Sequence, residues 1–118
     1  MNRLRAILLL FAPLAFACAQ SPPPEVTPPW LDAMIARLES EPVANPPAFI
    51  ARYEYRGDTV YYLPSRCCDI WSQVFTKTGD VICAADGGMT GGGDGRCPDF
   101  FETRREEKIV WRDTRSSR

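Results

Sequence analysis

The sequence contains no histidine, and this absence removes many enzyme mechanisms. Histidine is the side chain most used for acid–base chemistry near pH 7 and the commonest metal ligand. An excess of basic charge is also missing, because 14 lysine and arginine residues oppose 15 aspartate and glutamate residues, for a net charge of -1. Nucleic-acid binders of the usual kind carry such an excess. We therefore expect a protein that is not an enzyme and does not bind nucleic acid.

A membrane-spanning apolar run is missing as well. The longest apolar run, residues 6–17, has 12 residues, whereas a spanning helix needs about 20. Arg3 and Arg5 precede it and small residues follow it, which is the layout of a secretory signal. We expect residues 1–17 to be a signal peptide of the lipoprotein type, or 1–19 if an ordinary signal peptidase cuts after Ala19.

Cleavage after Ala17 would leave Cys18 as the first residue, with its sulfur available for lipid. Residues 18–29 are rich in proline, and such segments act as semi-rigid spacers. We expect a protein that is exported and anchored in the membrane through a lipid on Cys18, facing the periplasm or the cell exterior. A freely secreted protein is the alternative.

The remaining chain is long enough for one domain, which we place at residues 30–113, followed by a disordered tail at 114–118. Thr27 is a candidate helix cap, and the first helical turn tolerates the two prolines that follow it. Pro42 sets the end of this helix by Glu41. The predicted helix is amphipathic because its apolar residues recur at helical spacing, at Trp30, Leu31, Met34, Ile35 and Leu38.

Residues 49–56 alternate between apolar and mostly charged side chains, which predicts a half-buried strand. Further strands are predicted at residues 59–63, 68–75, 81–83 and 108–112, and the charged run 102–107 fits a turn or a short helix. The fold class that follows is α+β. We expect the N-terminal helix to pack across one face of an antiparallel sheet of about five strands.

Four cysteines fall in this domain: Cys67, Cys68, Cys83 and Cys97. Two disulfides of about 2–4 kcal/mol each would stabilise so small a core. Adjacent residues of an extended chain point to opposite faces, so Cys67 and Cys68 are expected to have different partners. Cys67 with Cys83 and Cys68 with Cys97, or the crossed pairing, are both allowed, whereas a bond between the two neighbours is least favoured. Adjacent thiolates also suit zinc poorly.

Residues 84–96 hold six of the eight glycines of the chain. We identify this segment as a candidate binding loop, with Asp86, Thr90, Asp94 and Arg96 as its polar residues. We expect no cofactor, with Asp86 and Asp94 as weak candidate ligands for calcium. Tight turns are the simpler explanation for aspartate–glycine pairs, and the loop lacks the ligand spacing of an EF-hand.

Several short motifs occur in a characteristic order along the chain. They are YEYRG at 53–57, VYY at 60–62, CCD at 67–69, DGG at 86–88 and GDGRCPDF at 93–100. In these motifs the chain resembles an uncharacterised family of small bacterial lipoproteins and secreted proteins. The resemblance implies an exported protein without supplying an activity or catalytic residues.

The function that these features favour is a non-catalytic binding or interaction module at the cell envelope, with an envelope protein or a surface ligand as its partner. A calcium-binding structural or sensor domain that uses loop 84–96 is one alternative. A hydrolase that works without histidine is another, since paired carboxylates can hydrolyse glycosides. Its candidate acid–base residues are Asp69, Asp86, Asp94 and Asp99.

Overall fold

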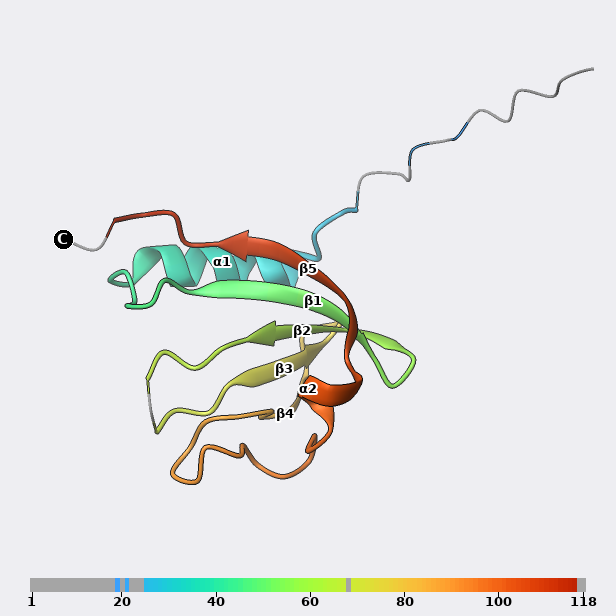
Figure 1. Cartoon of the computed structure of the whole chain (residues 1–118). Coiled ribbons are helices and arrows are strands. Elements are labelled where there is room, and N and C mark those ends of the chain that lie inside the picture. The colour runs from blue at the N-terminus through green and yellow to red at the C-terminus, as the bar shows by residue number, and fades with distance from the viewer. Residues whose placement is uncertain (1–18, 20, 22–24, 68, 117–118) are drawn as a thin grey trace, which may run out of the picture.

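A computed structural model describes residues 19, 21, 25–67 and 69–116 of the chain (Figure 1). The predicted signal peptide, the predicted lipid site Cys18 and the cysteine at position 68 lie outside the described residues. The elements are, in chain order, α1 (Pro29–Ser40), β1 (Phe49–Tyr55), β2 (Asp58–Leu63), β3 (Gln73–Thr76), β4 (Val81–Cys83), α2 (Phe100–Thr103) and β5 (Arg105–Arg112).

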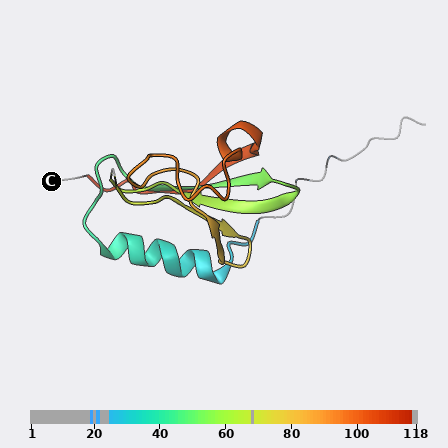
Figure 2. The same ribbon diagram turned by 90° about the horizontal axis from the view of Figure 1, so that it is seen from below.

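The five strands form one antiparallel sheet in the order β4-β3-β2-β1-β5. Strands β1 to β4 follow one another as a meander, and β5 returns to pair with β1 at the far edge. Helix α1 lies on one side of this sheet and α2 on the other (Figure 2). The predicted α+β fold, a helix with a five-stranded antiparallel sheet, is confirmed.

The first core lies between α1 and the sheet. Leu31 and Leu38 of α1 are buried against side chains of three strands, namely Ile50, Tyr61, Leu63 and Phe75. The cap predicted at Thr27 is wrong by one residue: the capping position is Pro28, and no side chain supplies a cap hydrogen bond. The carbonyl of Pro28 accepts hydrogen bonds from the backbone N–H groups of Leu31 and Asp32 at 2.9 and 3.2 Å.

A second core lies on the opposite face of the sheet, under α2 and the segment that precedes it. It consists of strand residues together with Ala85, Cys97 and Phe100, and its strand members include Ala51, Tyr53, Tyr55, Val60, Tyr62 and Val74. The alternation predicted in residues 49–56 is therefore present, since every second residue faces this core. All four tyrosines of the chain are buried in one core or the other, which leaves none of them as an exposed contact residue.

The strand predicted at 68–75 is wrong over residues 69–72. Strand β3 begins only at Gln73, and Ile70 and Trp71 are exposed instead of lying on alternate faces of the sheet. The reason is a tertiary contact: the backbone N–H of Ser72 donates to the carbonyl of Asp86 at 3.1 Å, not to a neighbouring strand. At the other end of the chain, the charged run 102–107 is divided between the end of α2 and the start of β5.

The cysteine pairing also differs from both favoured pairings. A disulfide joins Cys83 to Cys97 across 14 residues, and it is the only disulfide among the residues that the structure describes. Cys97 lies three residues before α2, and the folding of loop 84–96 back toward β4 brings it beside Cys83. Sequence spacing alone does not reveal this reversal of the chain.

Arg115 lies in the segment 114–118, for which a disordered tail is predicted. Its guanidinium donates hydrogen bonds to the carbonyls of Leu38, Glu39 and Glu41 at 3.2, 2.6 and 3.2 Å. These carbonyls lie in the last turn of α1 and just after it, where intrahelical partners run out, and that of Leu38 also accepts the backbone N–H of Glu41 at 3.3 Å. The guanidinium also pairs with Asp113 at 2.8 Å, so the C-terminal segment caps the first helix.

Candidate functional site

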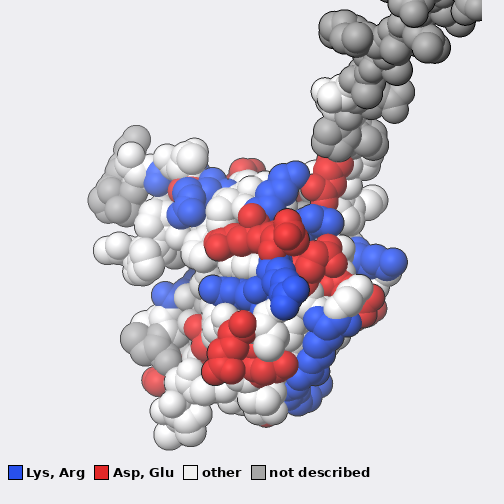
Figure 3. All heavy atoms as spheres, turned by 45° about the vertical axis from the view of Figure 1, so that its right-hand side comes forward, with Lys and Arg blue, Asp and Glu red and all other residues white. Residues whose placement is uncertain are grey.

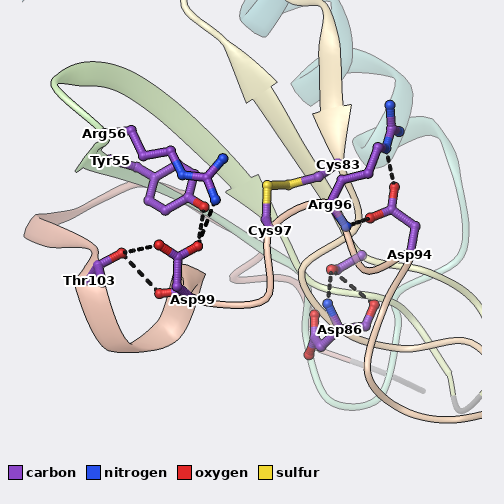
Figure 4. The surroundings of a disulfide bond; sticks show 10 residues. Tyr55, Arg56, Cys83, Asp86, Asp94, Arg96, Cys97, Asp99 and Thr103 are labelled. Carbon is purple, nitrogen blue, oxygen red and sulfur yellow. Dashed lines mark hydrogen bonds and ion pairs between the residues drawn. A yellow bond between two sulfur atoms is a disulfide. The ribbon is translucent and has the colours of Figure 1, made fainter.

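Loop 84–96 is closed at its base by the disulfide between Cys83 and Cys97 (Figure 4). Its backbone is braced by hydrogen bonds within the loop, each of 3.1 Å. Gly87 donates to Gly91, Gly93 donates to Gly87, and Asp94 donates to Ala84. Gly93 has a φ of 70°, and a Cβ atom there would collide with the carbonyl of Ala84. The glycines therefore allow a compact, self-bonded loop.

Asp86 attaches this loop to the sheet. Its carboxylate accepts a hydrogen bond of 3.0 Å from the hydroxyl of Tyr62, and its backbone N–H donates to the hydroxyl of Ser72 at 3.1 Å. Burial raises the pKa of Tyr62, and the nearby Asp86 carboxylate adds to the effect. The hydroxyl therefore stays protonated and able to donate. Asp86, predicted as a binding residue, is used to hold the loop in place.

Asp94 and Arg96 form a second side-chain contact that stabilises the loop. Nε of Arg96 lies 2.7 Å from one carboxylate oxygen of Asp94, and the backbone N–H of Arg96 donates to the other at 3.0 Å. These hydrogen bonds, the backbone one first, lower the pKa of Asp94. The Asp94 side chain is only 10% exposed, whereas that of Arg96 is 64% exposed. Arg96 is thus the member of this pair that a partner can contact.

The outermost part of the loop is Met89 and Thr90. Met89 is 96% exposed, and the hydroxyl of Thr90 accepts a hydrogen bond of 3.3 Å from the backbone of Gly92. Trp71 lies directly over Gly88, where a Cβ atom would collide with the indole ring. Trp71 is nevertheless 55% exposed, beside Ile70 at 56%.

We define the loop surface as the four exposed apolar residues Ile70, Trp71, Val81 and Met89. The first three line a depression of about 520 Å³, whose rim includes Asp94 and Arg96. The sequence interpretation did not identify this surface, because Ile70 and Trp71 were assigned to a strand. The one available signal was Met89, a lone apolar side chain among glycines.

Asp99 anchors the other end of the disulfide-closed region. It accepts hydrogen bonds from the hydroxyl of Tyr55 at 2.6 Å and from the guanidinium of Arg56 at 2.8 Å, as Figure 4 shows. Burial raises the pKa of Tyr55 to about 12, and the hydrogen bond to Asp99 adds to this rise. The same hydrogen bond lowers the pKa of Asp99. This contact fixes the start of α2 against the β1–β2 hairpin.

The four aspartates considered for hydrolysis do not meet in one cleft. Asp86, Asp94 and Asp99 each have their own partners, and of the four only Asp69 and Asp94 line the same depression. A carboxylic general acid needs a raised pKa, whereas the pKa values of Asp94 and Asp99 are lowered. The geometry therefore gives no support to a carboxylate pair.

Asp86 and Asp94 are the predicted candidate ligands for calcium. In the described part of the chain, no three histidine, cysteine, aspartate or glutamate residues are grouped so that they could hold a metal ion. Both carboxylates also have a protein donor already. Within the same described residues, no helix has the length and apolarity needed to cross a membrane.

Comparison with known proteins gives one match. The model of a family described as a domain of unknown function, DUF6970, matches residues 36–113. This range includes β1 to β5, the disulfide and the loop surface. Neither a curated protein nor a solved structure matches the chain. The expectation of an uncharacterised family is thereby confirmed.

Proposed function

The chain belongs to the DUF6970 family of domains of unknown function, and from this premise we propose that it is a non-catalytic interaction module of the cell envelope. The observation that carries the proposal is the loop surface. Of the seven large apolar side chains that are exposed in the described part of the chain, four belong to this surface, although the domain buries all of its tyrosines. Clustered exposed apolar residues beside a depression are typical of protein–protein contact sites.

The construction of the loop supports a binding role. The loop is held by the disulfide, by the Tyr62–Asp86 and Arg96–Asp94 side-chain contacts and by its internal backbone hydrogen bonds. It is therefore ordered without a partner. Pre-ordered binding surfaces lose less conformational entropy on association. Tryptophan and arginine are the residue types most enriched among those that dominate binding energy, and both occur here as Trp71 and Arg96. The partner that fits is a protein with an apolar contact surface.

Export and anchoring belong to the same proposal. The signal-like residues 1–17, the cysteine at position 18 and the proline-rich segment 18–29 support a domain held away from a membrane by a short spacer. The intact mass of the protein from an exporting host tests this directly. A mass for residues 18–118 plus lipid supports the anchor, and an unlipidated chain beginning at residue 20 would indicate free secretion.

The binding surface is tested by photo-crosslinking in the living host. A photoreactive residue replaces Thr90 at the loop tip, and a matched one replaces Glu106 on the exposed edge strand β5. We expect a discrete crosslinked protein from position 90 and not from position 106. The absence of a discrete product at position 90, or the same product at both positions, would contradict the proposal.

Two substitutions then measure the contribution of the loop surface to binding. Met89→Asp places a charge in the proposed contact, and Val26→Asp is the control because Val26 is 85% exposed and lies far along the chain from the loop. We expect Met89→Asp to weaken binding of the crosslinked partner at least about tenfold, with Val26→Asp unchanged. Equal effects of the two variants would argue against this surface.

A further inference from the structure

A second depression, of about 370 Å³, lies at the end of the sheet that carries the β1–β2 turn and the β3–β4 turn. Its lining comes from these two turns, from β4 and from the segment around Cys97. It shares only Arg96 with the depression at the loop surface. Its volume falls at the lower end of the range for small-molecule sites, roughly 300–1,000 Å³.

The floor of this depression is apolar. Val60 and Cys97 are buried members of the second core, and the half-buried Ile82 packs against the same core. The hydroxyl of Tyr55 is bonded to Asp99, so it is not an available donor for a ligand. A compact apolar group can therefore pack on this floor without leaving a buried polar atom of the protein unpaired.

The charged residues of the rim divide into two kinds. Arg56 and Arg96 each have a carboxylate of their own, Asp99 at 2.8 Å and Asp94 at 2.7 Å. Lys77 and Asp58 also line the depression. Within the described part of the chain, neither of these two has an ion-pair partner, and their side chains make no hydrogen bond.

The register of the sheet brings these two residues to the same end of the molecule. Val60 of β2 lies opposite Thr76 of β3. Asp58, two residues before Val60, therefore lies opposite the turn that follows Thr76 and contains Lys77. Asp58 at the start of β2 and Lys77 in the β3–β4 turn thus lie at the same end of the sheet without forming an ion pair with each other.

The surface charge around this end is mixed. Figure 3 shows that lysine and arginine side chains are interleaved with aspartate and glutamate on the flank that carries the β1–β2 turn. A polyanionic ligand would meet repulsion there. A ligand that carries one charge of each sign matches the rim.

We propose that this depression binds a free amino acid with an apolar side chain in its zwitterionic form. The ammonium group pairs with Asp58, the carboxylate pairs with Lys77, and the side chain packs on Val60 and Ile82. Charge-assisted hydrogen bonds of this type are stronger than neutral ones. The proposal concerns a different surface from the loop surface, so it stands or falls independently of the proposed partner.

The first test is an NMR titration of the ¹⁵N-labelled protein with L-leucine at about pH 6.5, where an α-amino group is charged. We expect saturable shifts at the amides of the β1–β2 turn and the β3–β4 turn. N-acetyl-L-leucine lacks the positive charge and L-leucinamide lacks the negative one, and each should bind about tenfold more weakly. No saturable shift, equal binding of the three compounds, or shifts only around Trp71 would overturn the proposal.

The second test assigns each charge to its residue. Asp58→Asn and Lys77→Gln should each weaken leucine binding about tenfold, whereas the controls Asp32→Asn and Lys108→Gln, which remove the same charges elsewhere, should not. Asp58→Asn should not weaken the binding of N-acetyl-L-leucine, because this compound lacks the ammonium group. Lys77→Gln should likewise not weaken the binding of L-leucinamide, because this compound lacks the carboxylate. If the variants lower the affinity for all three compounds equally, these residues do not contact the charged groups of the ligand.

Discussion

One face of the sheet is covered by the 12-residue helix α1, whereas the other is covered by loop 84–96 and the four-residue helix α2 (Figure 2). The helix face is held mainly by aliphatic side chains, together with the ring contacts of Trp30 with Tyr61 and Phe75. The loop face is held by edge-to-face and tilted aromatic rings around Phe100, a disulfide and tyrosine–aspartate hydrogen bonds. A segment with little regular secondary structure lacks the backbone ladder of a helix or sheet, so side chains must fix it.

The two faces also differ in which large apolar side chains they leave exposed. The helix side holds the partly buried aromatics Trp30 and Trp111 against the core. The loop side leaves Trp71 and Met89 exposed. Because a loop can be restrained at a few points and still expose residues between them, the irregular face is the one suited to carrying a contact surface.

The largest expected effect is the loss of the central aromatic ring of the loop face. Phe100 is fully buried and its ring lies 5.2–5.7 Å from the rings of Tyr53, Tyr55 and Tyr62. Phe100→Ala should lower the free energy of unfolding by about 3–5 kcal/mol, measured by urea denaturation. Leu31→Ala in α1 is the matched change on the helix face, and we expect a smaller loss. A larger loss for Leu31→Ala would reverse the comparison.

Removal of the disulfide should have the next largest effect, and a local one. Replacing Cys83 and Cys97 together by serine should cost about 3 kcal/mol, the value for a loop of this length. Amide hydrogen exchange should accelerate in residues 84–96 before it accelerates in α1. Uniform acceleration across both faces would show that the disulfide stabilises the whole domain and not the loop face in particular.

The smallest expected effect is a dependence on acidic pH. The hydrogen bond from Tyr55 lowers the pKa of folded Asp99, and hydrogen bonds from Arg115 lower the pKa of Asp113 at the end of α1. A carboxyl group whose pKa is lower in the folded state stabilises the fold fully above its unfolded pKa of about 3.9. This stability is lost as the pH falls through the folded pKa.

The two carboxyl groups can be separated by substitution. Unfolding curves between about pH 5 and pH 2 should become less pH-dependent in Asp99→Asn, which reports the loop face, and in Asp113→Asn, which reports the helix face. Asp32→Asn is a control for the change of charge. A pH dependence that neither Asp99→Asn nor Asp113→Asn reduces would show that other groups dominate acid unfolding.

Local patterns predicted most of the fold. The spacing of Leu31 and Leu38 identified the helix, and the alternation in residues 49–56 identified β1, because both depend on neighbours along the chain. The larger failures depend on distant contacts. Ile70 and Trp71 alternate as a strand would, but Ser72 bonds to the backbone of Asp86 and withdraws them from the sheet.

The binding role of loop 84–96 stays a prediction, whereas the positions of its polar residues can be compared with the structure. Loop 84–96 was recognised from its glycines, and of its four polar residues Thr90 and Arg96 are exposed at the surface. Asp86 and Asp94 were expected to meet a ligand, yet they bond to Tyr62 and Arg96. An aspartate beside glycine has the same local sequence whether it faces solvent or a tyrosine from another strand, so no local pattern distinguishes these cases.

The sequence by itself determined the absence of histidine chemistry, the near-neutral charge, the helix, the antiparallel strands and the glycine loop, since each of these follows from composition or from short-range periodicity. The tertiary structure alone decided the pairing of Cys83 with Cys97, the covering of the second sheet face by a loop, and the exposure of Trp71 beside Met89. These features arise when residues far apart in the chain compete for the same space, and that competition is settled only by packing.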